Sequence, residues 1–199
     1  MSGLEALARR RRMVRNFDSR PLSRELVISL IDTSRRAPSA GNTQGWRFLV
    51  LDGPDVGRYW NTTLPEERRA SFPWPGLLRA PALVIPLVDP TAYVARYDEP
   101  DKRRTGLGQH QGAWSVPYWF VDGGAAVMLL LLAATDAGLG ALLFGMFDHT
   151  DAVKAEFGVP SELLPIGTVA LGHPAPDRSS HSTQRPRELT EDLITWGGW

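Results

Sequence analysis

Apolar residues recur along the chain at spacings that change from segment to segment, and each spacing predicts one kind of element. Leu26, Leu30 and Ile31 stand at helical spacing after Ser23, which predicts a helix over residues 23–36. The same reasoning predicts short helices over residues 4–12 and 150–158, the second capped by Thr150 and Gly158, and strands over residues 46–51, 82–88, 141–147 and 166–171.

One predicted helix differs from the others because it is apolar on every side. It covers residues 123–136, with Asp122 as its N-cap and Gly138 after its end. A helix of this kind has no face for water, so we expect it at the centre of the protein. Pro86 lies inside the second predicted strand and lacks a backbone N–H, which predicts an edge strand or a bulge at that point.

Three segments have weaker patterns. Residues 54–80 are rich in Pro, Trp and Arg and carry a weak helical signal at best. The polar stretch over residues 89–118 is long for a small domain, which is typical of a lid, a binding segment or a disordered loop. The tail over residues 173–199 is polar and ends in Trp196 and Trp199, so we expect it to embrace a partner subunit.

Together these elements predict one α+β domain over residues 1–199, with a small mixed or antiparallel sheet of four to five strands flanked by helices. The longest apolar run, residues 125–134, is about half of the ~20 residues that a membrane span needs, so we expect a soluble protein without membrane contact. The N-terminus lacks the apolar core of a secretory signal, and a cytoplasmic location is expected.

The composition argues against several kinds of chemistry. Lys+Arg and Asp+Glu both total 22, and this balance disfavours a general nucleic-acid binder. The absence of cysteine excludes disulfides, thiolate nucleophiles and iron–sulfur clusters. The four histidines lack metal-ligand spacing, so no metal site is expected, and no GxSxG segment of a serine hydrolase is present. The GLG run at residues 138–140 leads into a strand instead of a helix, the reverse of a dinucleotide-binding turn.

The informative signal is a series of short segments in a fixed order. They are RRMVRNF (residues 11–17), APSAGNTQGW (residues 37–46), GLGALLFGMFD (residues 138–148), LGHP (residues 171–174) and the basic pair Arg185 and Arg187. On these segments the chain resembles the FMN-dependent nitroreductase family, whose N-terminal signature reads close to RRSxRxF followed by APSxxNxQPW. The likeness covers both ends and the centre of the chain and leaves residues 54–120 unmatched.

The resemblance implies a phosphate site built from both ends of the chain. FMN carries a dianionic phosphate, and planar guanidinium groups bind its oxygens in pairs. Arg11, Arg185 and Arg187 are the candidates for this contact. Surface ion pairs with Glu188 or Asp192 are the alternative interpretation.

Further residues of the first motif are implied beside the flavin. Arg12 is placed at the ribityl chain or the pyrimidine edge, and Met13 stands where the family usually has Ser, so one hydroxyl contact is lost or replaced by backbone. Arg15 is placed near flavin N1, where a positive charge favours reduction; pairing with Asp18 is an equal alternative. Gly45 stands where Pro is common, which we expect to loosen its loop.

The flavin ring is implied to lie between two other segments. Pro38, Ser39 and Ala40 would cover it from the other subunit, and Asn42 would fix the pyrimidine ring or serve as a turn residue.

On the strand side, Gly145 would direct its backbone N–H at flavin N5, with Leu143 and Phe144 packed against the ring or within the strand core. The substrate side is assigned to three aromatic residues that suit the core equally well: Tyr118, Trp119 and Phe120.

The resemblance therefore implies a homodimer with two FMN sites and a hydride transfer in two halves. NADH or NADPH would reduce FMN at N5 and leave, and a small aromatic acceptor such as a nitro compound or a quinone would take its place. No acid or base side chain is needed, and none is assigned. Two alternatives remain open: an enzyme for a dedicated small molecule, with residues 89–118 conferring specificity, or a protein that sequesters flavin.

Overall fold

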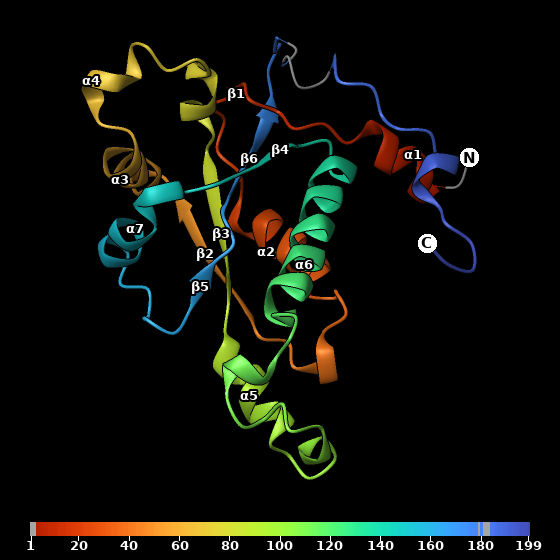
Figure 1. Ribbon diagram of the computed structural model, residues 1–199. Helices are drawn as coiled ribbons and strands as arrows, with labels where there is room; N and C mark the ends of the chain where they lie inside the picture. The colour runs from red at the N-terminus through yellow and green to blue at the C-terminus, as the bar shows by residue number, and fades with distance from the viewer. Residues whose placement is uncertain (1–2, 179, 181–183) are drawn as a thin grey trace.

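The computed structural model describes residues 3–178, 180 and 184–199 (Figure 1). The parts of the predicted tail at residues 179 and 181–183 lie outside this description. The α-helices are α1 (Gly3–Arg10), α2 (Arg24–Ser34), α3 (Pro54–Thr63), α4 (Glu66–Arg69), α5 (Pro90–Tyr97), α6 (Tyr118–Asp136) and α7 (Thr150–Glu156). Short 3-10 turns are η1 (Ala40–Asn42), η2 (Pro75–Arg79), η3 (Arg103–Thr105), η4 (Gln111–Ala113), η5 (Phe147–His149) and η7 (Glu191–Leu193).

One antiparallel sheet forms the middle of the described structure. Its strands are β1 (Phe17–Asp18), β2 (Trp46–Asp52), β3 (Ala82–Val88), β4 (Gly140–Phe144), β5 (Leu164–Pro165) and β6 (Thr168–Pro174). The order is β1–β6–β3–β2, with β4 also paired to β6 and β5 to β3. The predicted α+β class is confirmed. The strands β1 and β5 escaped prediction because two residues are too few to show an alternating pattern.

Helices cover both faces of this sheet, so the molecule has three layers (Figure 1). Alternate residues of β3 serve opposite faces: Leu83 and Ile85 pack with α3 and α7, whereas Val84 packs with α2 and α6. The helix α6 is central, as its apolar sequence predicts. Its outer face is not covered, because Val121 and Met128 are 52% and 47% exposed.

The prediction that Asp122 caps this helix was wrong. The helix α6 begins at Tyr118, and Asp122 lies in its second turn, where it is 6% exposed. Its carboxylate accepts hydrogen bonds from Ala40 and Tyr93, which belong to other segments. By length and composition alone α6 would suffice to cross a membrane; in this fold it packs against α2, β3 and β4.

The prediction for Pro86 was wrong as to an edge strand and is confirmed as to a bulge, because residues 85–86 of β3 lie opposite three residues, 166–168, between the pairings with β5 and β6. All of β3 is buried, and β3 is paired with β2 on one side along its length. On the other side β6 pairs with residues 82–84 and β5 with residues 87–88, so Pro86 falls in the interval between them. Its carbonyl there accepts a hydrogen bond of 2.9 Å from Ile166, so the missing N–H interrupts no ladder.

Two segments without a clear pattern contain helices. The helix α3 starts with Pro54 in its first turn, and α5 starts behind Asp89, whose carboxylate accepts from the backbone N–H groups of Thr91 and Ala92. Residues 89–118 are therefore a helix followed by 3-10 turns instead of an open loop. Both helices are short, so their apolar positions are too few to establish a period.

The segment after β4 departs from the prediction in two ways. The strand ends at Phe144, three residues early, and Phe147 adopts a left-handed φ of 51°. Thr150 is the first residue of α7 instead of its cap, and its hydroxyl donates to the Phe147 carbonyl over 3.2 Å. Gly158, with φ 64°, follows the helix end as predicted.

Candidate functional site

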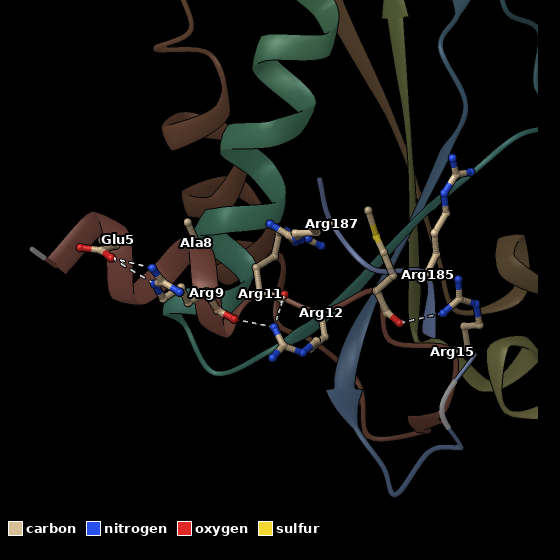
Figure 2. A pocket seen from close by; sticks show the side chains of 9 residues that line it. Glu5, Ala8, Arg9, Arg11, Arg12, Arg15, Arg185 and Arg187 are labelled. Atoms are coloured by element: carbon tan, nitrogen blue, oxygen red, sulfur yellow. Dashed lines mark hydrogen bonds and ion pairs between the residues drawn. The ribbon is translucent and has the colours of Figure 1, made fainter. Parts of the chain in front are cut away.

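An open cavity of about 880 Å³ lies beside the end of α1 (Figure 2). Arginine side chains from the N-terminal segment and from the tail surround it. Its lining consists of Glu5, Ala8, Arg9, Arg11, Arg12, Met13, Arg15, Arg185 and Arg187. The structure thus brings together six of the residues assigned to the cofactor from the sequence, and it adds Arg9, which the arginine run already contained.

Backbone contacts explain how distant segments meet at this cavity. After α1 the chain becomes extended, and Met13 forms a bridge to Ala141 in β4, with Val14 N–H donating to the Ala141 carbonyl over 3.0 Å. The start of the tail is fastened to the same segment, because Asp177 accepts from the Arg15 backbone N–H over 2.9 Å. The described end of the tail, residues 184–199, lies beside α1 (Figure 1), and its residues Arg185 and Arg187 line the cavity.

The cavity has a large excess of positive charge. Glu5 forms an ion pair of 3.0 Å with Arg9. No ion pair within 4.0 Å joins Arg11, Arg15 or Arg187 to a carboxylate among the described residues, and the same holds for Arg12 and Arg185. Like charges held this close repel one another, so an anionic ligand would be stabilised here.

Arg11 provides the test of whether a phosphate group fits. Its Nη1 atom is buried and has no hydrogen-bond partner among the described residues. A buried donor left unpaired is costly, and a phosphate oxygen is the acceptor that a guanidinium group binds best. The residues of this cavity therefore fit the phosphate of FMN.

Arg15 does not form the ion pair with Asp18 that was the alternative to a flavin contact. Asp18 pairs instead with Arg20 over 2.9 Å, and the Arg20 backbone N–H helps to hold the pKa of the Asp18 carboxyl below its usual value. Arg15 lies half-buried with its guanidinium over the ring of Trp74, 5.2 Å from the centroid, and donates to the Met13 carbonyl over 3.1 Å. Neither Glu188 nor Asp192 forms an ion pair with an arginine in the part of the chain that the structure describes.

Arg12 is turned back toward α1. Its Nη1 donates to the carbonyl oxygens of Arg9 and Arg11, the second over 3.0 Å. These carbonyls lie at the C-terminal end of the helix, where a positive charge is favourable. Arg12 therefore lines the cavity as a residue that also caps α1.

The segment assigned to cover the flavin ring lies elsewhere in the same chain. Pro38 and Ser39 lead into η1, and Ala40 is bonded to Asp122 near the beginning of α6. The arginine cavity is near the other end of α6, where Arg10 contacts Asp136 over 3.8 Å. Fourteen residues of helix separate Asp122 from Asp136, about 21 Å. One chain therefore does not bring the two groups together.

The residues assigned to the strand side lie along β4. Met13 lines the cavity opposite Ala141, and Gly145 lies four residues further on, about 14 Å along an extended strand. Phe144 stacks on Trp60 at 5.8 Å with the rings nearly parallel, which fits the core interpretation of this side chain. Leu143 packs toward the α2 and α6 side of the sheet.

The three aromatics at the start of α6 do not share one environment. Trp119 is 6% exposed and packs with Tyr93 and Trp114, so it belongs to a core cluster. Tyr118 and Phe120 are 44% and 41% exposed. Asp122 follows these residues, and it is a buried polar group to which the sequence assigned no role in the site. Its single acidic side chain among apolar helix positions was the only feature of the sequence that pointed to it.

Comparisons with known proteins agree with this fold. The Nitroreductase family profile matches residues 8–173. The 5,6-dimethylbenzimidazole synthase of Rhodospirillum rubrum is 30% identical over 208 residues, covering 94% of this chain and 92% of the relative. The NADH dehydrogenase of Thermus thermophilus is 30% identical over 186 residues, covering 84% and 85%. The crystal structure of a candidate nitroreductase from Desulfovibrio desulfuricans, in complex with FMN, has a TM-score of 0.71 at 22% identity, covering 100% of this chain and 99% of that one.

Fold and relatives together define an α+β oxidoreductase with a cationic cavity at one side of its sheet. The chain belongs to the nitroreductase family, because the family profile spans most of its length.

Proposed function

We propose that this protein binds FMN and uses it to pass a hydride from NADH or NADPH to a small aromatic acceptor, such as a nitro compound or a quinone. The observation that supports the proposal most directly is the cavity lined by six arginines, with the buried and unpaired Nη1 of Arg11. The FMN in the Desulfovibrio desulfuricans structure lends further support.

The side chains that line the cavity would make most of the proposed contacts. Arg11, Arg185 and Arg187 would hold the phosphate, and Arg15, fixed against Trp74, would present its charge to the ring. FMN, when bound, supplies a ring position that accepts and then donates a hydride. The backbone N–H of Gly145 would face that position, and no side chain is required to move a proton.

The proposed site needs two copies of the chain. The loop with Pro38, Ser39, Ala40 and Asn42 lies at one end of α6, and the arginine cavity lies near the other. A dimer across the outer face of α6 would bring the loop of one subunit to the cavity of the other. The exposed apolar side chains of the tail, Trp196 among them at 88%, are further surface for such a contact.

The first test uses the unmodified protein. Titration with FMN is expected to saturate at one flavin per chain, and NADH or NADPH is expected to bleach the bound flavin without oxygen. With a nitroaromatic acceptor, double-reciprocal plots at several acceptor concentrations should be parallel, because donor and acceptor use one site in turn. Failure to bind FMN would refute the proposal. A bound flavin that neither nicotinamide reduces would favour the flavin-sequestering alternative.

A second candidate is an enzyme for a dedicated small molecule. It is favoured by the 30% identity to 5,6-dimethylbenzimidazole synthase over 94% of the chain, since that relative is named for one product. Turnover of a panel of nitro compounds and quinones separates the candidates. A reductase of broad range should accept many of them, whereas a dedicated enzyme should bind FMN but turn over none efficiently.

A further inference from the structure

The loop over residues 38–44 contains two non-glycine residues in a left-handed backbone conformation. Gly41, Asn42 and Gln44 all have left-handed φ values, 62°, 54° and 52°. Such a conformation is disfavoured for residues other than glycine and persists only where the surroundings hold it. Bonds inside the loop, such as Ser39 Oγ accepting from the Gln44 N–H over 2.9 Å, account for part of this order.

A buried carboxylate on α6 holds the loop from outside. Asp122 Oδ2 accepts from the Ala40 backbone N–H and from the Tyr93 hydroxyl, both over 2.8 Å. Asp122 is 6% exposed and Tyr93 is fully buried. Burial, and secondarily the bond to Asp122, raises the pKa of the Tyr93 hydroxyl, which therefore remains the donor at neutral pH.

The helix α5 holds the same loop from a second side. Arg96 Nε donates to the Gly41 carbonyl over 2.8 Å, and Asp101 holds the Arg96 guanidinium with two bonds of 2.7 and 2.8 Å. In Figure 1, α5 and this loop lie together at the beginning of α6.

Steric fit also ties the loop to α5. A Cβ added at Gly45 would lie 2.5 Å from Tyr93 Cε2, and one at Gly41 would lie 2.8 Å from Tyr97 Cε2. Glycine at position 45 lets the ring of Tyr93 pack directly against the backbone, a contact that the expectation of a looser loop did not include. That ring is fully buried and packs edge-to-face against both Trp114 and Trp119, so it has little room to shift.

We propose that Asp122 is a positioning residue of the flavin site: together with Tyr93 and Arg96 it fixes the conformation of loop 38–44. This inference rests on the proposed function, in which that loop covers the flavin ring of the other subunit. The inference also changes the role expected for residues 89–118, which were predicted to form a lid. The segment is the support against which the ring-covering loop is built.

The experiment is hydrogen–deuterium exchange on the full chain, with and without FMN, read at the peptide containing residues 38–45. Asp122→Leu removes both acceptor bonds at similar volume and is expected to speed exchange of this peptide by about tenfold or more. Asp122→Asn keeps an oxygen for both donors and is expected to restore slow exchange. Gly45→Ala keeps every polar group but displaces Tyr93, and should speed exchange again.

Tyr93→Phe and Tyr59→Phe form a matched pair. Both delete one hydroxyl from a fully buried tyrosine; that of Tyr59 bonds Thr168 over 2.8 Å on the opposite face of the sheet. Both should lower the melting temperature. Only Tyr93→Phe should speed exchange at residues 38–45 and change the visible circular dichroism of bound FMN.

The exchange measurement does not require flavin. The proposed function and the positioning role of Asp122 can therefore be refuted independently of each other. If the wild-type chain binds no FMN, the proposed function is wrong while the exchange pattern still tests the support of the loop. If FMN binds but Asp122→Leu and Tyr93→Phe leave the loop exchange equal to that of Tyr59→Phe, Asp122 has no positioning role and the inference is wrong. The inference is equally wrong if Asp122→Asn exchanges as fast as Asp122→Leu.

Discussion

Replacing Arg11 and Arg187 together by glutamine is expected to weaken FMN binding by a factor of about 10² to 10⁴, since each charge-assisted bond to phosphate contributes roughly 1.5–3 kcal/mol. Each single variant should lose about one to two orders of magnitude. The dissociation constant is measured by quenching of flavin fluorescence. Because the cavity holds six arginines and one glutamate, removal of two charges should leave the melting temperature of the flavin-free protein unchanged or raise it.

Arg10→Gln is the matched control for this prediction. Arg10 precedes Arg11 in the chain, but its guanidinium lies 3.8 Å from Asp136 and is absent from the cavity lining. Its replacement should change FMN affinity less than threefold. This limit corresponds to about 0.5 kcal/mol, the energy of one exposed ion pair. Wild-type affinity in the double variant would show that the phosphate binds elsewhere. Equal losses in Arg10→Gln and Arg11→Gln would indicate a general effect of charge.

Met128→Asp is expected to convert a dimer into a monomer and to abolish FMN binding at micromolar protein. Met128 is 47% exposed on the outer face of α6, the proposed centre of the dimer. Two-fold symmetry would bury two added carboxylates, and each unpaired buried charge costs about 3–5 kcal/mol, so each would raise the dimer dissociation constant by about 10² to 10⁴. Sedimentation velocity gives the mass, and flavin fluorescence gives the binding.

Ala152→Asp serves as the control because Ala152 is exposed on α7, across the sheet from α6. This variant should remain dimeric and bind FMN normally. A Met128→Asp protein that is monomeric yet binds FMN with wild-type affinity would show that one chain completes the site, contrary to the separation between the ring-covering loop and the cavity. A wild-type protein that is monomeric with FMN bound would lead to the same conclusion.

Local features of the chain are predicted correctly where their cause is local. Ser23 is expected to begin a helix, and its side chain accepts from the Leu26 N–H over 3.1 Å. The period of apolar residues locates α2 and the continuous runs locate β2 and β3, because burial of one face or of both imposes these patterns directly. The arginines of the candidate cofactor site are visible as a run and a pair.

Other features are settled only in three dimensions, because they depend on groups far apart in the sequence. Pro86 is tolerated inside the sheet since β5 and β6 leave an interval opposite it. Phe144, which the motif left open between the flavin ring and the strand core, stacks on Trp60.

By itself the sequence determined the class of fold, the family resemblance and the kinds of residue available to bind an anion. The tertiary structure decided which of them meet. Arg185 and Arg187 line the same cavity as Arg11, and Asp177 fastens the start of the tail beside Arg15. Asp122 supports a loop some 80 positions earlier because a buried carboxylate takes whatever donors the fold brings to it, and no local pattern encodes that encounter.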